Sequence, residues 1–322
     1  MPYLWHKKTM KSEFLLYAAP LQGYTELAWR EAHRRTIGGV DVYGAPFVQW
    51  EKDGLRNKDR REMDPAANHV ERLVPQVLVA EPEEFRRLVS VLDGWGYREV
   101  EVNMGCPFSV LVRKGKGAGL LPCPDRVWAL LEAMRDFPDI GFSVKMRLGA
   151  ERPDEWEALL PLFNGSVVRR LTVHPRVGRQ QYRGEVDREQ FAAFYERCTK
   201  PLVYNGDLRS LAQAQEVLRA YPRLAGLMLG RGLLARPTLA LEIRRGKEAT
   251  EEELIAYTAL WHRQWVAACS ERIEGGEAQL LQKLRTMWDY LLPDLPKRQR
   301  KAILKANRLE AYLAGVREAL GQ

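Results

Sequence analysis

Residues 101–108 read Glu-Val-Asn-Met-Gly-Cys-Pro-Phe, and residues 113–120 read Arg-Lys-Gly-Lys-Gly-Ala-Gly-Leu. The first stretch is an extended apolar run that stops abruptly at Gly105, so it predicts a strand followed by a loop that carries Cys106. Enzymes of the α/β class place reactive side chains where a strand ends. A lone cysteine is also commonly a small buried apolar residue, so the role of Cys106 depends on the rest of the chain.

Seven other β-like runs accompany this one along the first three quarters of the chain. Each is short, and most are rich in Val, Leu or aromatic residues, which is typical of strands buried on both faces. The predicted strands are Phe14–Ala19, Val40–Tyr43, Pro75–Val79, Glu99–Met104, Phe142–Arg147, Arg170–His174, Leu202–Asn205 and Gly226–Leu229.

Amphipathic stretches lie between these strands, and several begin with Pro, Asp or Glu, where first-turn signals belong. A polar insert over 51–67 interrupts the second unit. The predicted helices are Thr25–Arg35, Glu81–Asp93, Pro124–Asp136, Asp154–Phe163, Asp187–Arg197 and Leu211–Ala220.

Eight strands that alternate with helices predict an α/β fold with a parallel sheet. Two architectures compete, an open doubly wound sheet and a closed (β/α)₈ TIM barrel. The count of eight and the span of roughly 240 residues favour the barrel, whose typical length is about 250 residues. No G-x-G-x-x-G follows the first strand, which counts against a dinucleotide-binding sheet. We therefore predict a barrel over residues 1–245.

The strand-like runs stop at about residue 246. Thr250 and Glu253 have the spacing of a capping box, which marks a helix start. The last 77 residues therefore predict a small C-terminal all-helical domain over 246–322. Its predicted helices are Thr250–Ser270, Glu277–Tyr290 and Lys297–Leu313.

Cations gather at the start of the last predicted helix, at Lys297, Arg298, Arg300 and Lys301. They form either a solvated helix face or an RNA-binding face, and charge alone does not distinguish the two. The whole chain of 322 residues has a net charge of +8 and a pI near 9.3. That excess indicates an anionic partner, of which nucleic acid is the commonest.

The remaining composition narrows the class of protein. No apolar stretch reaches about 18 residues, so we expect no membrane span. The apolar run over 14–21 is too short for a signal peptide and contains Pro20, so we expect a cytoplasmic protein. The cysteines contain no C-x-x-C pair, which indicates reduced thiols rather than disulfides or a metal site. They are Cys106, Cys123, Cys198 and Cys269.

Polar side chains follow the ends of six of the predicted strands. Lys145 is notable because it interrupts an apolar strand, and a buried ammonium needs an anionic partner, either a carboxylate or a ligand. The chemistry of a barrel gathers at the carboxyl ends of its strands. The polar residues there are Gln76, Asn103, Lys145, Arg147, His174, Arg176, Asn205, Asp207 and Arg231.

Together these strand ends suit a planar cofactor that carries a phosphate. Amide and imidazole groups would hold the ring edge, and Lys145 would oppose negative charge on the reduced ring. The loops after strands seven and eight are where barrels bind phosphate. The pattern is that of an FMN site. Taken singly, His174 could be a core histidine and Asn205-Gly206 a plain turn.

Through these motifs the chain resembles the tRNA-dihydrouridine synthases, flavoenzymes that reduce uridine in tRNA. The motifs occur in the family's order along nearly the whole barrel, and N-x-G-C-P with its downstream G-A-x-L-L is the most specific of them. The helical tail fits the family's RNA-binding domain by type. The matching segments are 19–23, 102–107, 117–121, 144–149, 173–176, 204–207 and 229–232.

Two departures from the family pattern leave the target nucleotide open. Leu21 replaces a usual Met, and Glu26 stands near the position of an expected Asp. The segment 44–48 replaces a more common Ser/Thr-Glu pattern.

The resemblance implies that Cys106 is the general acid that protonates C5 of the uracil, while hydride passes from the flavin to C6. Cations at Arg113, Lys114 and Lys116 would tune the pKa of the thiol. Asn103 and Arg176 would hold the uracil. NADPH would reduce the flavin. The implied FMN-binding residues are Pro20, Gln76, Lys145, His174, Asn205, Gly206, Asp207, Gly230 and Arg231.

The target base must leave its stack to reach a thiol inside a barrel mouth. The helical tail, at Lys297, Arg298, Arg300 and Lys301, and the barrel rim would grip the RNA backbone in a salt-sensitive way. We expect a monomer. Three alternatives stay open: dihydrouridine formation on ribosomal RNA, a small-molecule FMN barrel such as a dihydroorotate or enoate reductase, and an RNA-binding protein without flavin.

Overall fold

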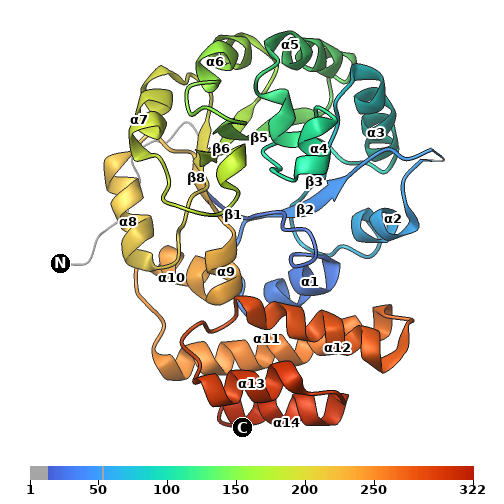
Figure 1. Ribbon diagram of the computed structural model, residues 1–322, viewed down its shortest axis with the longest axis vertical. Helices are drawn as coiled ribbons and strands as arrows, with labels where there is room; N and C mark the ends of the chain where they lie inside the picture. Colours follow the sequence, from blue (N-terminus) through green and yellow to red (C-terminus); the bar gives the residue numbers. More distant parts are fainter. Residues whose placement is uncertain (1–13, 53) are drawn as a thin grey trace.

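The computed structural model describes residues 14–52 and 54–322. Its eight strands are all parallel and close into a barrel in chain order, with β1 paired to β8 (Figure 1). The predicted TIM barrel is therefore confirmed. The strands are β1 Leu15–Ala18, β2 Val42–Val48, β3 Leu73–Val77, β4 Glu99–Met104, β5 Gly141–Gly149, β6 Arg170–Val177, β7 Leu202–Tyr204 and β8 Gly226–Leu229.

A ring of helices surrounds the barrel. The first-turn signals act as expected, since Pro82 and Pro124 open their helices and Asp187 accepts a hydrogen bond from the Gln190 backbone N–H. The helices are α1 Leu27–Thr36, α2 Asn57–Met63, α3 Pro82–Gly94, α4 Ser109–Arg113, α5 Pro124–Ala133, α6 Trp156–Gly165, α7 Arg188–Arg197, α8 Leu211–Ala220, α9 Arg231–Ala235 and α10 Leu239–Arg245.

The second unit differs from its prediction. Strand β2 begins and ends later than expected and includes Pro46, which has no N–H to donate. The pairing of β2 with β3 shifts register between Ala45 and Val48, which accommodates this proline. The polar insert after β2 contains the short helix α2.

Four helices follow the barrel: α11 Glu251–Arg272, α12 Gly276–Thr286, α13 Lys297–Lys305 and α14 Leu309–Ala319. The capping box is present, with reciprocal hydrogen bonds between Thr250 and Glu253. The predicted single helix over 297–313 is wrong. The backbone is extended at Ala306 and Arg308, and α14 folds back on α13 instead. Tertiary packing of two apolar faces here overrides a continuous helical propensity.

The apolar core joins these two parts of the chain. One cluster of buried side chains runs from Leu16 in β1 to Leu320 after α14, and α1 packs against α11. In Figure 1, α11 to α14 form a layer beneath the barrel, next to α1. A second, smaller cluster fills the barrel itself: Tyr17, Ala19, Val42, Val74, Val203 and Met228.

Helix α10 ends where Gly246 takes a left-handed conformation, with φ of 65°. The division into two domains at this residue stays a prediction, since both sides share the core. No helix in the described part of the chain is both long enough and apolar enough to cross a membrane.

Candidate active site

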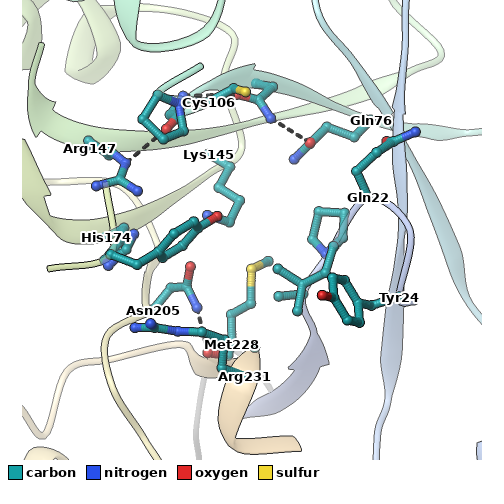
Figure 2. Close-up of a pocket in the computed structure, with 18 of the residues that line it drawn as sticks. Gln22, Tyr24, Gln76, Cys106, Lys145, Arg147, His174, Asn205, Met228 and Arg231 are labelled. Atoms are coloured by element: carbon teal, nitrogen blue, oxygen red, sulfur yellow. Dashed lines mark hydrogen bonds between the residues drawn. The ribbon is translucent and has the colours of Figure 1, made fainter. Parts of the chain in front are cut away.

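A pocket opens at the carboxyl ends of the barrel strands (Figure 2). Strand ends β1 to β8 all contribute to it, and Tyr290 reaches it from the helical segment after α12. Two of the predicted site residues, Gly206 and Arg176, lie outside its lining. The predicted residues that do line it are Pro20, Gln76, Asn103, Cys106, Lys145, His174, Asn205, Asp207, Gly230 and Arg231.

Cys106 lies at the end of β4 and is 7% exposed. Burial raises the pKa of its thiol, and the positive charges of Arg147 and Lys145 oppose that rise only in part. A thiol with a raised pKa keeps its proton at neutral pH. Cys106 is therefore equipped to donate a proton rather than to act as a thiolate nucleophile.

The cations that act on this thiol differ from those expected. Lys116 forms an ion pair with Glu84, while Arg113 and Lys114 are exposed to solvent. The prediction that these three cations tune Cys106 is wrong, because their charges are paired or solvated. The neighbouring charges come from β5 instead.

The glycine-rich stretch over residues 113–120 supports the loop that carries the Cys106 thiol. The Ala118 N–H donates to the Cys106 carbonyl at 3.0 Å. Gly117 has φ of +59°, and a Cβ there would lie 2.7 Å from that carbonyl oxygen. Gly119 likewise approaches the Val112 backbone too closely for a side chain. These glycines let two segments of backbone touch, which explains why the two motifs occur together.

A chain of hydrogen bonds links the barrel interior to the same loop. Gln76 donates through Nε2 to Glu101 Oε1 at 2.7 Å, and Asn103 donates through Nδ2 to Gln76 Oε1 at 2.7 Å. Asn103 Oδ1 accepts from the backbone N–H groups of Gly105 and Cys106 at 2.9 and 2.8 Å. Backbone N–H groups can only donate, so the Asn103 oxygen must face them. This fixes the orientation of the Asn103 side-chain amide and, through it, that of Gln76. Each NH₂ group keeps one hydrogen for a ligand.

Lys145 lies near the centre of the labelled side chains in Figure 2. It makes no hydrogen bond or ion pair with any residue that the structure describes. Burial lowers its pKa to about 8, and the charge of Glu101 opposes this only in part. A partly buried ammonium without a partner favours an anionic group placed opposite it.

His174 is held as a neutral ring. Arg176 Nη1 donates to His174 Nε2 at 3.0 Å, and since arginine can only donate, the ring proton must be on Nδ1. Burial is the main cause that lowers the pKa of His174 well below its usual value. The ring therefore offers an N–H donor at neutral pH.

Arg176 itself does not occupy the predicted place. Its side chain is 1% exposed and also donates to the Gly184 carbonyl and to Asp207. The predicted role of uracil ligand does not fit this placement, because Nη1 and Nη2 are both engaged behind His174 and Arg176 does not line the pocket. Its Nε is buried without a hydrogen-bond partner among the described residues. Arg176 positions its neighbours instead.

Two residues that the sequence left unassigned are prominent in the pocket. Arg147 donates through Nε to the Gly105 carbonyl at 2.9 Å and through Nη1 to the Val177 carbonyl at 3.0 Å. The ring of Tyr182 lies 5.4 Å from the Arg147 guanidinium and 4.8 Å from that of Arg231. Arg147 is among the predicted polar strand-end residues but has no predicted role there. Its two-residue spacing from Lys145 on one strand could have indicated that both serve the same site, since alternate residues share a face. Nothing local indicates Tyr182.

The ends of β7 and β8 form the opposite wall. Asp207 accepts from Arg231 at 2.8 Å and from Arg176. Burial opposes its ionisation, but the hydrogen bond and charge of Arg176 hold the pKa of Asp207 below its usual value. Asn205 donates through Nδ2 to the Met228 carbonyl at 2.8 Å. This wall therefore presents the Arg231 guanidinium, held in place by Asp207, next to the backbone of Gly230, which has no side chain to cover it.

The helical segment contacts the barrel mouth directly. Tyr24 and Tyr290 both line the pocket and meet edge to face, 5.2 Å apart. Lys283 donates to the Gly23 carbonyl at 2.6 Å and to Glu26 at 2.5 Å. The loop after β1 is therefore fixed by residues more than 250 positions away.

The predicted RNA-binding cations divide into two groups. Lys297, Arg298 and Lys301 are exposed on α13. Arg300 donates to three backbone carbonyls, including that of Leu291 at 3.0 Å. Its predicted role is corrected, because this guanidinium closes the preceding turn instead of facing solvent.

The model of the family described as dihydrouridine synthase matches residues 17–303. The chain is 28% identical over 234 residues to tRNA-dihydrouridine synthase B of Escherichia coli K12, covering 71% of each protein. It is 27% identical to the Serratia marcescens protein of the same name, covering 71% of this chain and 68% of that one.

Among solved structures, the chain is similar in fold to morphinone reductase in complex with tetrahydroNAD. The TM-score is 0.51 at 12% identity, and the match covers 75% of this chain and 89% of that one. A variant of NCR from Zymomonas mobilis gives the same TM-score, 0.51, over 76% of this chain and 91% of that one. These likenesses concern the barrel fold.

Proposed function

Because the chain belongs to the dihydrouridine synthase family, a family of oxidoreductases, we propose that it reduces a uridine of tRNA to dihydrouridine with FMN and NADPH. The observation that carries the proposal is Cys106, a thiol kept protonated by burial at the mouth of the barrel. The names of the relatives, which are tRNA-dihydrouridine synthases, support tRNA as the substrate.

The donor set of the pocket fits FMN. Lys145 offers an unpaired ammonium, and the amide of Gln76 and the neutral ring of His174 offer N–H donors for the heteroatoms of a flavin ring. Arg231 and the Gly230 backbone at the ends of β7 and β8 suit a phosphate. When bound, FMN supplies the hydride for C6 of the uracil, and NADPH restores it.

The residues of the chain supply the rest of the chemistry. Reduction of an isolated C=C bond needs a hydride at one carbon and a proton at the next. The Cys106 thiol gives its proton to C5 and is left as a thiolate, which Arg147 and Lys145 stabilise electrostatically until solvent reprotonates it.

The uracil is held by groups whose polarity the protein fixes. The free N–H of Asn103 Nδ2 and the guanidinium of Arg147 can donate to the two uracil carbonyls. Arg147 replaces Arg176 in this role, because it lines the pocket and Arg176 does not. Tyr182 lines the same pocket, with its ring 5.4 Å from the Arg147 guanidinium.

The first test is mass-spectrometric mapping of dihydrouridine. The purified protein and NADPH are incubated with unmodified tRNA and, separately, with ribosomal RNA. A gain of two hydrogens at one uridine of tRNA supports the proposal and identifies the position. A gain on ribosomal RNA alone would change the substrate. No gain on either RNA, from a yellow protein that oxidises NADPH, would indicate a small-molecule reductase.

The matched variant for this assay is Cys106→Ala. We expect it to keep its flavin and its affinity for tRNA and to lose turnover by roughly 10²–10⁴-fold, the usual contribution of a general acid. Flavin content is read from the visible absorption spectrum and tRNA affinity from a filter-binding titration. Full turnover by this variant would remove the thiol from the acid role.

A further inference from the structure

The loop that carries Cys106 leads through Phe108 into the short helix α4, and two large apolar side chains are exposed at this junction. Phe108 is 66% exposed and Val110 is 55% exposed. Helix α4, which begins one residue after Phe108, has no buried residue at all. Large apolar side chains exposed together on a soluble protein commonly mark a contact surface.

Phe108 differs from the other exposed aromatic side chains in its position and its contacts. Three aromatic side chains of the described chain are exposed: Phe108, Trp128 and Tyr182. Phe108 and Tyr182 line the catalytic pocket, whereas Trp128 does not. Tyr182 is already held between two guanidiniums, while no ring or cation–π contact from the described residues reaches Phe108. The face of this ring is available at the rim of the pocket.

The surroundings of Phe108 are basic. Arg113 and Lys114 are exposed at the end of α4, and Arg209 is exposed on the opposite rim. An exposed aromatic ring beside cations suits single-stranded nucleic acid, where bases stack and phosphates are neutralised. It does not suit an apolar protein surface, which would have to bury these charges.

We propose that Phe108 is a stacking platform for the nucleotide next to the target uridine. The inference rests on the proposed function. A uridine that leaves its stack to enter the pocket exposes the face of its neighbour in the chain. A ring at the pocket rim, two residues from the thiol, then takes the place of the lost stacking partner, while Arg113 and Lys114 meet the phosphates.

The test compares four proteins on the tRNA whose modified uridine has been mapped. Phe108→Ala should weaken binding by roughly 5- to 100-fold, the range for removal of one aromatic–base stack. Phe108→Tyr should bind within about twofold of the wild type, because it keeps the ring. Trp128→Ala, which removes an exposed aromatic ring away from the pocket, should leave the affinity unchanged. Thermal midpoints verify that all variants are folded.

A second arm identifies the partner of the ring. tRNAs with an abasic residue on the 5′ or the 3′ side of the mapped uridine are titrated against the wild type and Phe108→Ala. One of the two should bind the wild type as weakly as intact tRNA binds Phe108→Ala, with no further loss in the combination. The slope of log Kd against log salt should be the same for both proteins, since stacking releases no counterion.

Several results would overturn the inference. Unchanged affinity of Phe108→Ala would remove the ring from the RNA surface. Losses that add fully in both abasic combinations would show that Phe108 touches neither neighbour. Failure of Phe108→Tyr to restore binding would point to shape rather than stacking. A wild type that forms no dihydrouridine would instead refute the proposed function, and the two failures are thus distinguishable.

Discussion

Three ionisable side chains in and next to the pocket are each shifted toward their neutral form: Cys106 and Lys145 line it, and Glu101 accepts a hydrogen bond from the pocket residue Gln76. Burial raises the pKa values of Cys106 and Glu101 and lowers that of Lys145. The common cause is loss of hydration, which disfavours charge whatever its sign. A site shifted in this way has a thiol that can give a proton and an ammonium that gains stability when an anion arrives.

Lys145 yields a prediction about pH. Its pKa is about 8 in the folded protein and about 10.4 in an unfolded chain. Between these values the folded state binds fewer protons, so this residue makes stability rise with pH, and below pH 8 its full penalty is present. Lys145→Met should therefore stabilise the flavin-free protein at pH 7, by up to roughly 3 kcal/mol, and by much less at pH 10.

The measurement is urea unfolding of the wild type and Lys145→Met at pH 7 and pH 10. The exposed Lys247→Met serves as the control, and its difference from the wild type should not change with pH. A stability difference for Lys145→Met that is the same at both pH values would contradict the lowered pKa.

Glu101 yields a second prediction at this scale. It supplies the acceptor that ends the chain of hydrogen bonds from Asn103 through Gln76. Glu101→Gln keeps an oxygen that can accept from Gln76, whereas Glu101→Met leaves that N–H buried without a partner, at a cost of about 1–3 kcal/mol. Turnover should fall at least tenfold in Glu101→Met and less than threefold in Glu101→Gln, in single-turnover assays on tRNA. Equal losses in both variants would show that the charge matters and the acceptor does not.

At the scale of elements, the site depends on backbone that touches backbone. The segment after β4 that holds Cys106 rests on the 3₁₀ turn Gly117–Leu120. Arg147 from β5 ties the Gly105 carbonyl of the same segment. The thiol is therefore positioned by two neighbouring elements, although it lies in a loop. Loops that carry function are commonly fixed by the scaffold in this way.

Gly117→Ala should displace this loop. Its Cβ would overlap the Cys106 carbonyl, and its φ of +59° adds backbone strain of about 1 kcal/mol. Turnover on tRNA should fall at least tenfold, and the thermal midpoint should also fall. Gly96→Ala is the matched control, because Gly96 has φ of +87° but no atom within 4 Å of the added Cβ. If both variants lose turnover equally, strain rather than steric overlap would be responsible.

At the scale of the whole molecule, the helical segment completes the mouth of the barrel. Tyr290 lines the pocket, and Lys283 holds the loop after β1. The shared apolar core keeps α11 against α1, so the exposed face of α13 has a fixed place relative to the pocket (Figure 1). An RNA bound at the mouth can therefore meet two fixed surfaces at once.

Charge reversal on α13 tests the second surface. The triple variant Lys297→Glu, Arg298→Glu and Lys301→Glu should bind tRNA more weakly, with a salt slope smaller by about 1 for each phosphate that the protein no longer neutralises. NADPH oxidation by the flavin should be unchanged. Arg300→Ala should instead lower the thermal midpoint, because three backbone carbonyls lose their hydrogen bonds to this guanidinium. Unchanged tRNA affinity in the triple variant would show that these cations form a solvated helix face and do not bind RNA.

The sequence by itself determined the barrel and most of the strand-end residues. Alternating apolar runs and first-turn signals are local patterns, and in a closed parallel barrel every strand delivers its last residues to the same rim. That rule is enough to bring Gln76, Asn103, Cys106, Lys145 and His174 into one pocket. The capping box is also a local pattern, and it correctly predicted the start of α11.

Only the tertiary structure decided what each charged side chain does there. Arg176 and Arg147 both lie near the carboxyl ends of their strands, yet Arg176 hydrogen-bonds behind His174 and Arg147 lines the pocket. Arg300 lies among exposed cations but closes a turn, and the break after α13 appears only when two helices pack. The reason is physical. Whether a charged side chain is free or hydrogen-bonded depends on which acceptors lie within reach in the folded structure, and spacing along the sequence does not give that distance.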